Sequence, residues 1–496
     1  MTRRRGILWS LAVVILLLLV VVWSGGSARR PVNPRLASTN VKAKYQFERL
    51  EQNRGAQQDL VILAFSGGGT RAAAFSYGVL EALRRIHVNT STGGKVRLLD
   101  EIDVVTGISG GSFTALAFGL KGDKLFDSYE QDFLKRDVQG ELVRRAMNPL
   151  HWRALMSRGW GMSELAANLY DEILFHGATY ADLGRVGTPA IVVGAAELST
   201  GSRLTFTQQN FDVMCADLES FRLARAAAAS SAVPVVLSPL TINNYGATCG
   251  YQEPDWLLEF ENSPTPPRPA GRILKRLQEL RELDNAAEDP YFHLVDGAVS
   301  DNLGLRGVLD FLETFEALRA AGKVTPLDHV RRILIFVVNS VSTPSTNWNT
   351  HESPPGSMAV LTKAAGVPVD RYANESVELL RDIDARWTAM RELRESPAFK
   401  GNRDPKAAFV MNAPNADIFV IDVSFQAVKD KAERDYLNEL PTSFVLPAAA
   451  VDSLRAAAAS LVLGSPDLEK ALKSAGEEID NAPGAAAKPA PAAAKP

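Results

Sequence analysis

The chain has 496 residues, of which 46% are hydrophobic and 22% charged, a composition that can bury a sizeable core in two or three domains. Its 54 basic and 57 acidic residues give a formal net charge of -3, and the basic residues are scattered along the chain. A nucleic-acid-binding protein needs a concentrated positive surface, so this balance disfavours that class.

The N-terminus predicts an export or anchoring segment. Arg3, Arg4 and Arg5 precede an apolar run from Ile7 to Trp23 that only Ser10 interrupts. Such a run exceeds the roughly 7–15 residues of a signal-peptide core and reaches the lower limit of about 17 for a membrane span. We therefore expect residues 1–30 to anchor the protein on the extracytoplasmic, periplasmic face of a membrane. Small residues at 24–28 leave cleavage, and hence secretion, open.

The main part of the chain alternates between two hydrophobic patterns. Residues 31–55 have no sustained period, which predicts a linker. After them, strand-length apolar runs are separated by helical patterns; the runs are DLVILAF, IDVVTGI, AIVVGAAEL, RRILIFVVNS and ADIFVIDVSF. This alternation predicts an α/β fold with a mainly parallel central sheet.

Three stretches interrupt the alternation and predict helical insertions, namely 127–185, 252–283 and 358–396. The second ends in RILKRLQELREL, whose leucines recur at helical spacing. This helix is expected to pack on the core, or to serve as a lid with some membrane affinity. The Ala/Pro/Lys-rich end predicts a disordered tail, assigned to 471–496. The two cysteines, Cys215 and Cys249, are expected either to form a disulfide or to stay as buried free thiols.

The first predicted strand ends in a glycine-rich turn. Its sequence is Ser66-Gly67-Gly68-Gly69-Thr70-Arg71, and a helical pattern follows. Glycines at such a turn let several backbone N–H groups face an anion beside a helix N-terminus. Neither nucleotide pattern fits, because the Gly-Lys-Ser/Thr ending is missing and Ala72 stands at the third glycine of the dinucleotide fingerprint. The turn is therefore expected to hold the oxyanion of an acyl-transfer intermediate.

The next strand leads into a candidate nucleophile. Gly107-Ile108-Ser109-Gly110-Gly111 lies between IDVVTGI and a helical stretch, the strand–turn–helix order of a nucleophile elbow. We predict that Ser109 is the nucleophile, and a serine needs a base to accept its proton.

The base has several candidates. His151, His176, His293, His329 and His351 follow the serine, and none has a persuasive setting. By contrast, the short strand FHLV ends in Asp296-Gly297-Ala298, and α/β enzymes place functional groups at strand ends. The residues alone leave two arrangements open: a direct Ser109–Asp296 pair, or a triad that adds His329 or His351.

Several motifs in this order resemble the patatin-like phospholipase family. They are the strand–SGGGTR–helix, the GISGG elbow, PAIVVGAAELSTGSRLTFT, ARAAAASSAVPVVLSPL and VDGAVSDN. The resemblance covers roughly residues 58–345. It implies a three-layer patatin-like fold with a catalytic domain over 56–345 and helical insertions. The resemblance does not clearly cover residues 346–470, which are expected to form a mixed C-terminal extension packed on that domain.

The resemblance also implies a function. Family members cleave acyl esters of lipids with a Ser–Asp dyad and without histidine, and we expect this chain to use no metal or cofactor. Carried to this sequence, Ser109 is the nucleophile, Asp296 the base, and the backbone of Gly67, Gly68 and Gly69 the oxyanion hole. Arg71 is expected to face the oxyanion loop or to bind an acidic head group of the substrate. The alternatives are an α/β-hydrolase esterase with a histidine triad and a non-catalytic, membrane-anchored binding protein.

This sequence departs from the family pattern at two positions. Ala72 replaces the glycine that usually follows the loop arginine, and Ala298 replaces the second glycine of Asp-Gly-Gly. Both replacements are small, so the loop and the aspartate are expected to keep their roles.

Overall fold

The computed structural model describes residues 29–39, 58–89 and 94–475, apart from short gaps at 158, 185–187, 235, 256–257, 259–261, 263–269, 326–327, 345 and 347. The predicted anchor, Ile7–Trp23, lies outside the described residues, as does the low-complexity end. Among the helices of the described part, none is by itself long and apolar enough to cross a membrane, and one bent pair, Ala448–Leu463 with Pro466–Ser474, passes that test jointly.

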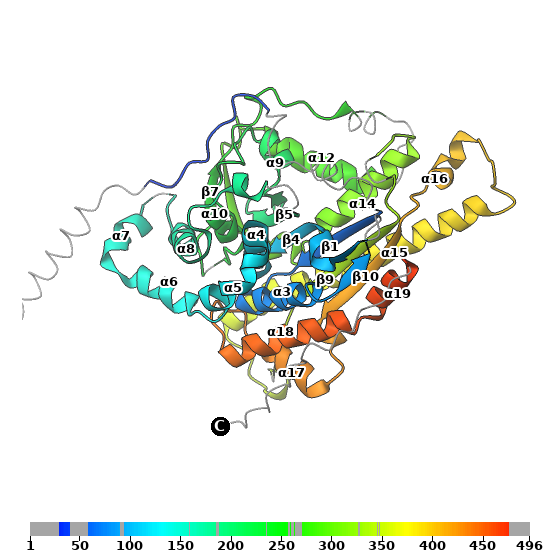
Figure 1. The fold of residues 1–496 in the computed structure, drawn as a ribbon. Coiled ribbons are helices and arrows are strands. Elements are labelled where there is room, and N and C mark those ends of the chain that lie inside the picture. The colour runs from blue at the N-terminus through cyan, green and yellow to red at the C-terminus, as the bar shows by residue number, and fades with distance from the viewer. Residues whose placement is uncertain are drawn as a thin grey trace, which may run out of the picture.

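The centre of the molecule is an eight-stranded sheet (Figure 1). Its strand order is β10-β9-β1-β4-β5-β8-β7, with β6 paired to β5. Five neighbouring strands are parallel: β10 (Asp417–Ser424), β9 (Arg332–Asn339), β1 (Asp59–Phe65), β4 (Ile102–Ile108) and β5 (Ala190–Glu197). The other three form antiparallel pairs: β8 (Tyr291–Asp296), β7 (Leu240–Asn243) and β6 (Arg203–Thr205). The predicted α/β fold with a mainly parallel sheet is confirmed.

Helices cover both faces of the sheet, which explains the continuous apolar strands. Along β1, Val61, Leu63 and Phe65 belong to one hydrophobic core, while the alternate side chains belong to a second core. The first core also includes side chains of α3 (Gly69–Leu83), α4 (Gly110–Lys121) and α18 (Ala448–Leu463), and the second those of α14 (Leu305–Ala320) and α15 (Ser357–Glu395). Because successive strand residues face opposite sides, a strand covered on both sides is apolar at nearly every position.

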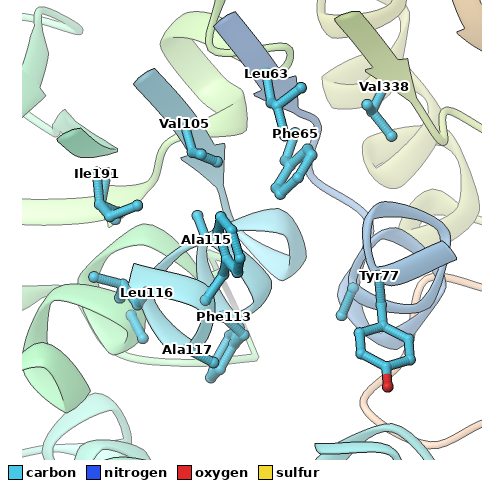
Figure 2. Packing of buried hydrophobic residues seen from close by; sticks show 14 of the residues in the cluster. Leu63, Phe65, Tyr77, Val105, Phe113, Ala115, Leu116, Ala117, Ile191 and Val338 are labelled. Carbon is cyan, nitrogen blue, oxygen red and sulfur yellow. The ribbon is translucent and has the colours of Figure 1, made fainter. Parts of the chain in front are cut away.

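Figure 2 shows the first core, where α4 lies against the sheet. Ala115 of α4 packs against β4, since a Cβ atom at Gly107 would lie 2.9 Å from the Ala115 Cβ. Phe113 points away from the sheet and stacks on Phe133, and both rings are fully buried. This packing fixes the beginning of α4 relative to the end of β4. The turn between these two elements holds Ser109.

Further elements surround these layers. The hairpin β2 (His87–Asn89) and β3 (Lys95–Arg97) lies between α3 and β4 in the chain. The helices are α5 (Leu125–Tyr129), α6 (Val138–Met147), α7 (Pro149–Leu155), α8 (Met162–Tyr170), α9 (Gln208–Val213), α10 (Leu223–Ser230), α12 (Ala270–Asp284), α13 (Ala298–Asp301), α16 (Ala408–Met411), α17 (Lys431–Glu439) and α19 (Pro466–Ser474). In α12, Leu277, Leu280 and Leu283 are buried, so its apolar stripe packs on the core as a surface helix does.

The region after residue 346 completes the sheet. Its strand β10 pairs with β9 along eight residues, and its helix α18 lies against α3. The chain stays ordered beyond the predicted start of the tail, because α19 runs to Ser474 with Leu468, Ala471 and Leu472 buried. The tail assignment at 471 is therefore corrected: apolar residues one helical turn apart hold this last helix on the domain.

The predicted linker begins on the surface of the domain. Asn33 is buried and exchanges two hydrogen bonds with Asn243 of β7, at 2.9 and 2.8 Å. The Leu36 N–H donates to the carbonyl of Cys215 at 2.8 Å. Residues 33–36 are thus part of the folded domain; the rest of the predicted linker, from residue 40, lies outside the described residues.

Cys215 and Cys249 form a disulfide, which resolves the alternative left open by the sequence. The two Cα atoms are 5.5 Å apart, and 34 residues of sequence separate the cysteines. The bond ties the end of α9 to the loop after β7.

Replacing both cysteines with alanine is expected to lower the free energy of unfolding by about 4 kcal/mol, because a crosslink of this span removes conformational freedom from the unfolded chain. Urea denaturation of the wild type and the double variant measures the difference. Adding a thiol reductant should bring the wild type to the variant's midpoint and leave the variant unchanged. Equal midpoints without reductant would show that the crosslink contributes nothing.

Candidate active site

Ser109 occupies a strained turn at the carboxyl end of β4. Its backbone φ is 48° and ψ is -119°, a conformation rarely adopted by a residue with a side chain. Its N–H donates to the Ser230 hydroxyl at 2.8 Å, and that hydroxyl donates to the carbonyl of Gly194 at 2.7 Å. Ser230 therefore links the turn to the neighbouring strand β5. This contact gives the Ala-Ser-Ser segment a physical role that the sequence alone did not reveal.

Asp296 ends β8 and faces the serine. The Ser109 hydroxyl donates to Oδ2 of Asp296 at 2.8 Å, and the Ala298 N–H donates to Oδ1 at 2.9 Å. Both side chains are buried, each with only 4% of its surface exposed. The Asp296 N–H donates to the carbonyl of Ala232, which fixes the strand end beside α10. The two predicted residues are thus brought into direct contact.

Burial raises the pKa of Asp296 from 3.8 to about 6, since a charged carboxylate loses hydration in this position. The hydrogen bonds from Ala298 and Ser109 oppose this effect, because they favour the ionised form. At neutral pH the carboxylate is still mostly ionised, yet it is a stronger base than an ordinary aspartate.

The histidines that remained candidate bases from the sequence do not take part in the contact between Ser109 and Asp296. His329 precedes β9, at the amino ends of the parallel strands, whereas Ser109 lies at their carboxyl ends. The exposed His351 shares a hydrogen bond with Thr350, and His293 shares one with Thr241. The serine hydroxyl bonds directly to the carboxylate, with no imidazole between them.

The glycine-rich turn packs against the turn that carries Ser109. A Cβ atom at Gly110 would lie 2.0 Å from the carbonyl oxygen of Gly69, and one at Gly67 would lie 3.2 Å from the Ser109 Cβ. Only residues without side chains allow this approach. The two turns therefore form one site, with the N-terminus of α3 beside the serine.

The backbone N–H groups of this turn are not equivalent. The Gly67 N–H donates to the carbonyl of Asn302 at 3.0 Å and is therefore occupied, which corrects its predicted place in the oxyanion hole. Within the described residues, the N–H groups of Gly68, Gly69 and Gly110 have no acceptor. Gly68 has a φ of 142°, which turns the chain into α3.

Arg71 does not point toward a substrate site. Its side chain is buried, and its Nε and Nη1 donate to the carbonyls of Ser340 and Leu440 at 2.8 and 2.7 Å. The expected contact with an acidic head group is thus replaced by contacts within the protein. The other expectation was that Arg71 faces the oxyanion loop, and the structure agrees with it. Nη2 of Arg71 lies 3.0 Å from the position that a Cβ of Gly68 would take, so Arg71 supports the glycine-rich turn.

The segment between α17 and α18 holds the same turn from the other side. The Thr70 N–H donates to the carbonyl of Ser443 at 2.8 Å, next to the Leu440 carbonyl that binds Arg71. The Ser443 hydroxyl donates to Gln139 of α6 at 2.9 Å. This segment therefore connects the glycine-rich turn with the helical insertion.

Comparison with known proteins gives one decisive match. The family described as patatin-like phospholipase matches residues 63–309, a range that contains both turns and Asp296. Residues 63–309 form a patatin-like phospholipase domain. A comparison with curated protein sequences gives no match.

Solved structures similar to this chain include phospholipases. Two structures of human GIVD cytosolic phospholipase A2 match at 13% and 14% identity with TM-scores of 0.34 and 0.39; they cover 62% and 87% of this chain, and 51% and 63% of the human chains. The second contains methyl gamma-linolenyl fluorophosphonate. ExoU of Pseudomonas aeruginosa, in complex with SpcU, matches at 14% identity with a TM-score of 0.20, covering 87% of this chain and 84% of that chain.

The residues that hold the two turns of the active site in place could be predicted only in part from the sequence of the patatin-like domain. Ser230 and Asn302 fall inside motifs that the sequence singled out, so a signal existed for them. Ser340, Leu440 and Ser443 follow the matched range and act through backbone carbonyls, which leave no sequence signal. Among the described residues, no group of three or more His, Cys, Asp or Glu is arranged to hold a metal ion.

Proposed function

We propose that this protein is a lipid acyl hydrolase of the phospholipase A or lysophospholipase type, and that Ser109 and Asp296 form its catalytic dyad. The observation that carries the proposal is the 2.8 Å hydrogen bond from the Ser109 hydroxyl to the Asp296 carboxylate, within a patatin-like phospholipase domain. Neither a metal nor a cofactor is required by the steps below.

The first half of the reaction acylates the serine. The Ser109 hydroxyl oxygen bonds to the ester carbonyl carbon while its proton passes to Asp296. The carbonyl oxygen becomes an oxyanion, and the N–H groups of Gly68 and Gly69 donate to it. The C–O bond of the lipid then breaks, the departing alcohol oxygen takes the proton from Asp296, and the acyl group stays on Ser109.

The second half releases the fatty acid. A water molecule gives its proton to Asp296 and attacks the acyl carbon, so that a second oxyanion forms in the same position. When the bond to Ser109 breaks, the serine oxygen takes the proton back. Because Asp296 carries the proton in both halves, one carboxylate with a raised pKa serves as base and then as acid.

We further propose that residues 7–23 anchor the enzyme at the extracytoplasmic face of a membrane, close to its lipid substrate. The apolar run preceded by three arginines supports this placement. The disulfide between Cys215 and Cys249 supports it as well, since such bonds persist in oxidising compartments. If the segment is cleaved, the enzyme is secreted.

Product analysis tests the proposed activity. Wild-type protein and Ser109→Ala are incubated with phospholipid vesicles, with lysophospholipid micelles and with a short-chain chromogenic ester. Mass spectrometry should detect free fatty acid and the deacylated lipid with the wild type and neither product with the variant. Absence of products from all three substrates, or equal amounts from both proteins, would contradict the proposal.

The pH dependence of kcat/KM should follow the ionisation of the Asp296 carboxyl group. Only the ionised carboxylate can accept the serine proton, so kcat/KM is expected to fall about tenfold per pH unit below about 6, the pKa to which burial raises this group. The profile should be measured with the soluble ester, over pH 4 to 8. A plateau that continues down to pH 4 would mean that an unperturbed or different base is at work.

A further inference from the structure

We propose that the outer surface of α6 and α7 is the face with which this protein docks onto a lipid bilayer. We call it the docking face and define it by Val143, Met147, Leu150, Trp152 and Met156. The proposal deepens the proposed function, because it rests on a lipid substrate and names the surface that brings the active site to it.

The docking face exposes large apolar side chains. Met147, Leu150 and Met156 are 71%, 72% and 70% exposed, and Val143 and Trp152 are exposed as well. Single exposed apolar residues are ordinary, but these five lie within 14 residues of sequence. The same helices are held to the domain by Leu142, which is buried, and by Ala146 and Leu155, which pack against the first core. The outward side chains are therefore presented by helices that are themselves fixed.

The docking face adjoins segments that build the active site. Gln139, in the first turn of α6, accepts a hydrogen bond from Ser443, whose carbonyl holds the glycine-rich turn. Beyond α7, the Ser163 N–H donates to the Ser238 hydroxyl at 3.2 Å. Ser238 lies in the loop that follows Ala232, whose carbonyl accepts the Asp296 N–H. The same loop carries Val236, a further apolar side chain that is 70% exposed. The docking face is thus carried by segments that contact the supports of the active site.

The N-terminal part of the chain reaches the domain at the same place. Arg30 crosses Gly159, just after the docking face, so closely that a Cβ there would meet its Cδ at 2.8 Å. Its guanidinium lies over the Tyr291 ring, 5.3 Å from the ring centre. The apolar sequence Ile7–Trp23 ends only seven residues before Arg30. This short spacing supports a membrane attachment near the docking face. In Figure 1, α6 and α7 project on the side opposite α15 and α16.

The chemistry of the docking face favours a lipid surface over a protein partner. Helices α6 and α7 contain three arginines and a single acidic residue, Glu141. Arg145 pairs with Glu172 at 2.7 Å, while Arg144 lies 3.6 Å from Asp137 and is 66% exposed. Protruding apolar residues, a tryptophan and flanking arginines match the interface between acyl chains and anionic head groups.

A site-specific probe tests the contact in the full chain. The sequence has no cysteine besides the disulfide pair, so a cysteine placed at Leu150 can be labelled selectively with a polarity-sensitive fluorophore. Each labelled protein also carries Ser109→Ala, which prevents vesicle hydrolysis. The control is Val324→Cys, which is 90% exposed and lies just before β9, at the amino ends of the strands.

With phosphatidylcholine vesicles that contain phosphatidylglycerol, the Leu150→Cys label should shift to shorter wavelength and be quenched by nitroxide-bearing lipids. The Val324→Cys label should change little. Pure phosphatidylcholine should give a smaller shift at position 150. No shift at 150, or equal shifts at both positions, would overturn the proposal. A blue-shifted label at 150 before vesicles are added would assign the face to another protein segment and also overturn it.

A kinetic experiment provides the second readout. Met147→Glu/Leu150→Glu should lower hydrolysis of anionic phospholipid vesicles at least tenfold and leave turnover of the soluble ester unchanged, whereas Val324→Glu should change neither. Unchanged vesicle hydrolysis would overturn the docking face. If the wild type cleaves no ester at all, the proposed function fails, while the fluorescence experiment still decides whether this surface meets lipid.

Discussion

Replacing Ser109 with alanine, or Asp296 with asparagine, is expected to lower kcat/KM for any ester substrate by roughly 10⁴-fold or more. The first change removes the attacking oxygen. The second keeps the shape of the side chain but removes the proton acceptor that lies 2.8 Å from the serine hydroxyl. Because the two groups work as a unit, the double variant should be hardly less active than either single one.

The aspartate variant should separate catalysis from stability. The folded pKa of Asp296, about 6, is above its ordinary value of 3.8, so ionisation of this group opposes folding at neutral pH. The associated stability is present at low pH and is lost as pH rises through 6. Asp296→Asn removes that cost and is expected to raise the free energy of unfolding at pH 8 by about 1–3 kcal/mol.

Matched controls exist among the buried polar side chains. Asp103→Asn changes another buried carboxylate, which accepts the Val61 N–H at 2.8 Å, and should leave kcat unchanged. Ser231→Ala removes the buried hydroxyl next to Ser230 and should also remain active. More than about 1% residual activity in Ser109→Ala or Asp296→Asn, measured with freshly purified protein, would exclude the dyad.

Replacing Gly68 with alanine is expected to lower kcat by about 10²–10³-fold, the usual effect of losing one oxyanion donor. The backbone φ of 142° excludes almost every residue except glycine. A Cβ atom there would lie 3.0 Å from Nη2 of Arg71 and 3.1 Å from the Ser340 hydroxyl oxygen. The turn must then move, and its N–H groups leave the position where charge develops. KM should change little, because the donors act on the transition state.

Gly177→Ala is the matched control for this experiment. Gly177 also has a positive φ, 84°, but a Cβ atom there would have no neighbour within 4 Å, so the substitution strains the backbone without a steric clash. Both variants should lose about 1 kcal/mol of stability or more, while only Gly68→Ala loses turnover. Equal kcat values for the two variants would place Gly68 outside the oxyanion hole.

The sequence alone determined the elements on which the site is built. Strands buried on both faces are apolar at most positions, so β1, β4, β5, β9 and β10 could be recognised as nearly continuous apolar runs. The sharp turn around Ser109 needs glycines on both sides, and the aspartate follows a short apolar strand. Each of these features depends on residues that are close together in the sequence, so each one produces a recognisable sequence pattern. The choice between a dyad and a triad was made at this stage by family resemblance, since the residues left both open.

The tertiary structure decided which of these groups meet and what supports them. Ser109 and Asp296 are 187 residues apart in the chain, and the pairing of β5 with β8 brings them together. The carbonyl of Leu440 holds Arg71 from 369 residues away, and the carbonyl of Asn302 occupies the Gly67 N–H. Every residue has a carbonyl, so contacts of this kind leave no pattern in the sequence. The same limit applies to α6 and α7, for which the sequence predicts helices without saying which side faces solvent. The structure shows that Leu142 packs inward and that Met147 and Leu150 face outward.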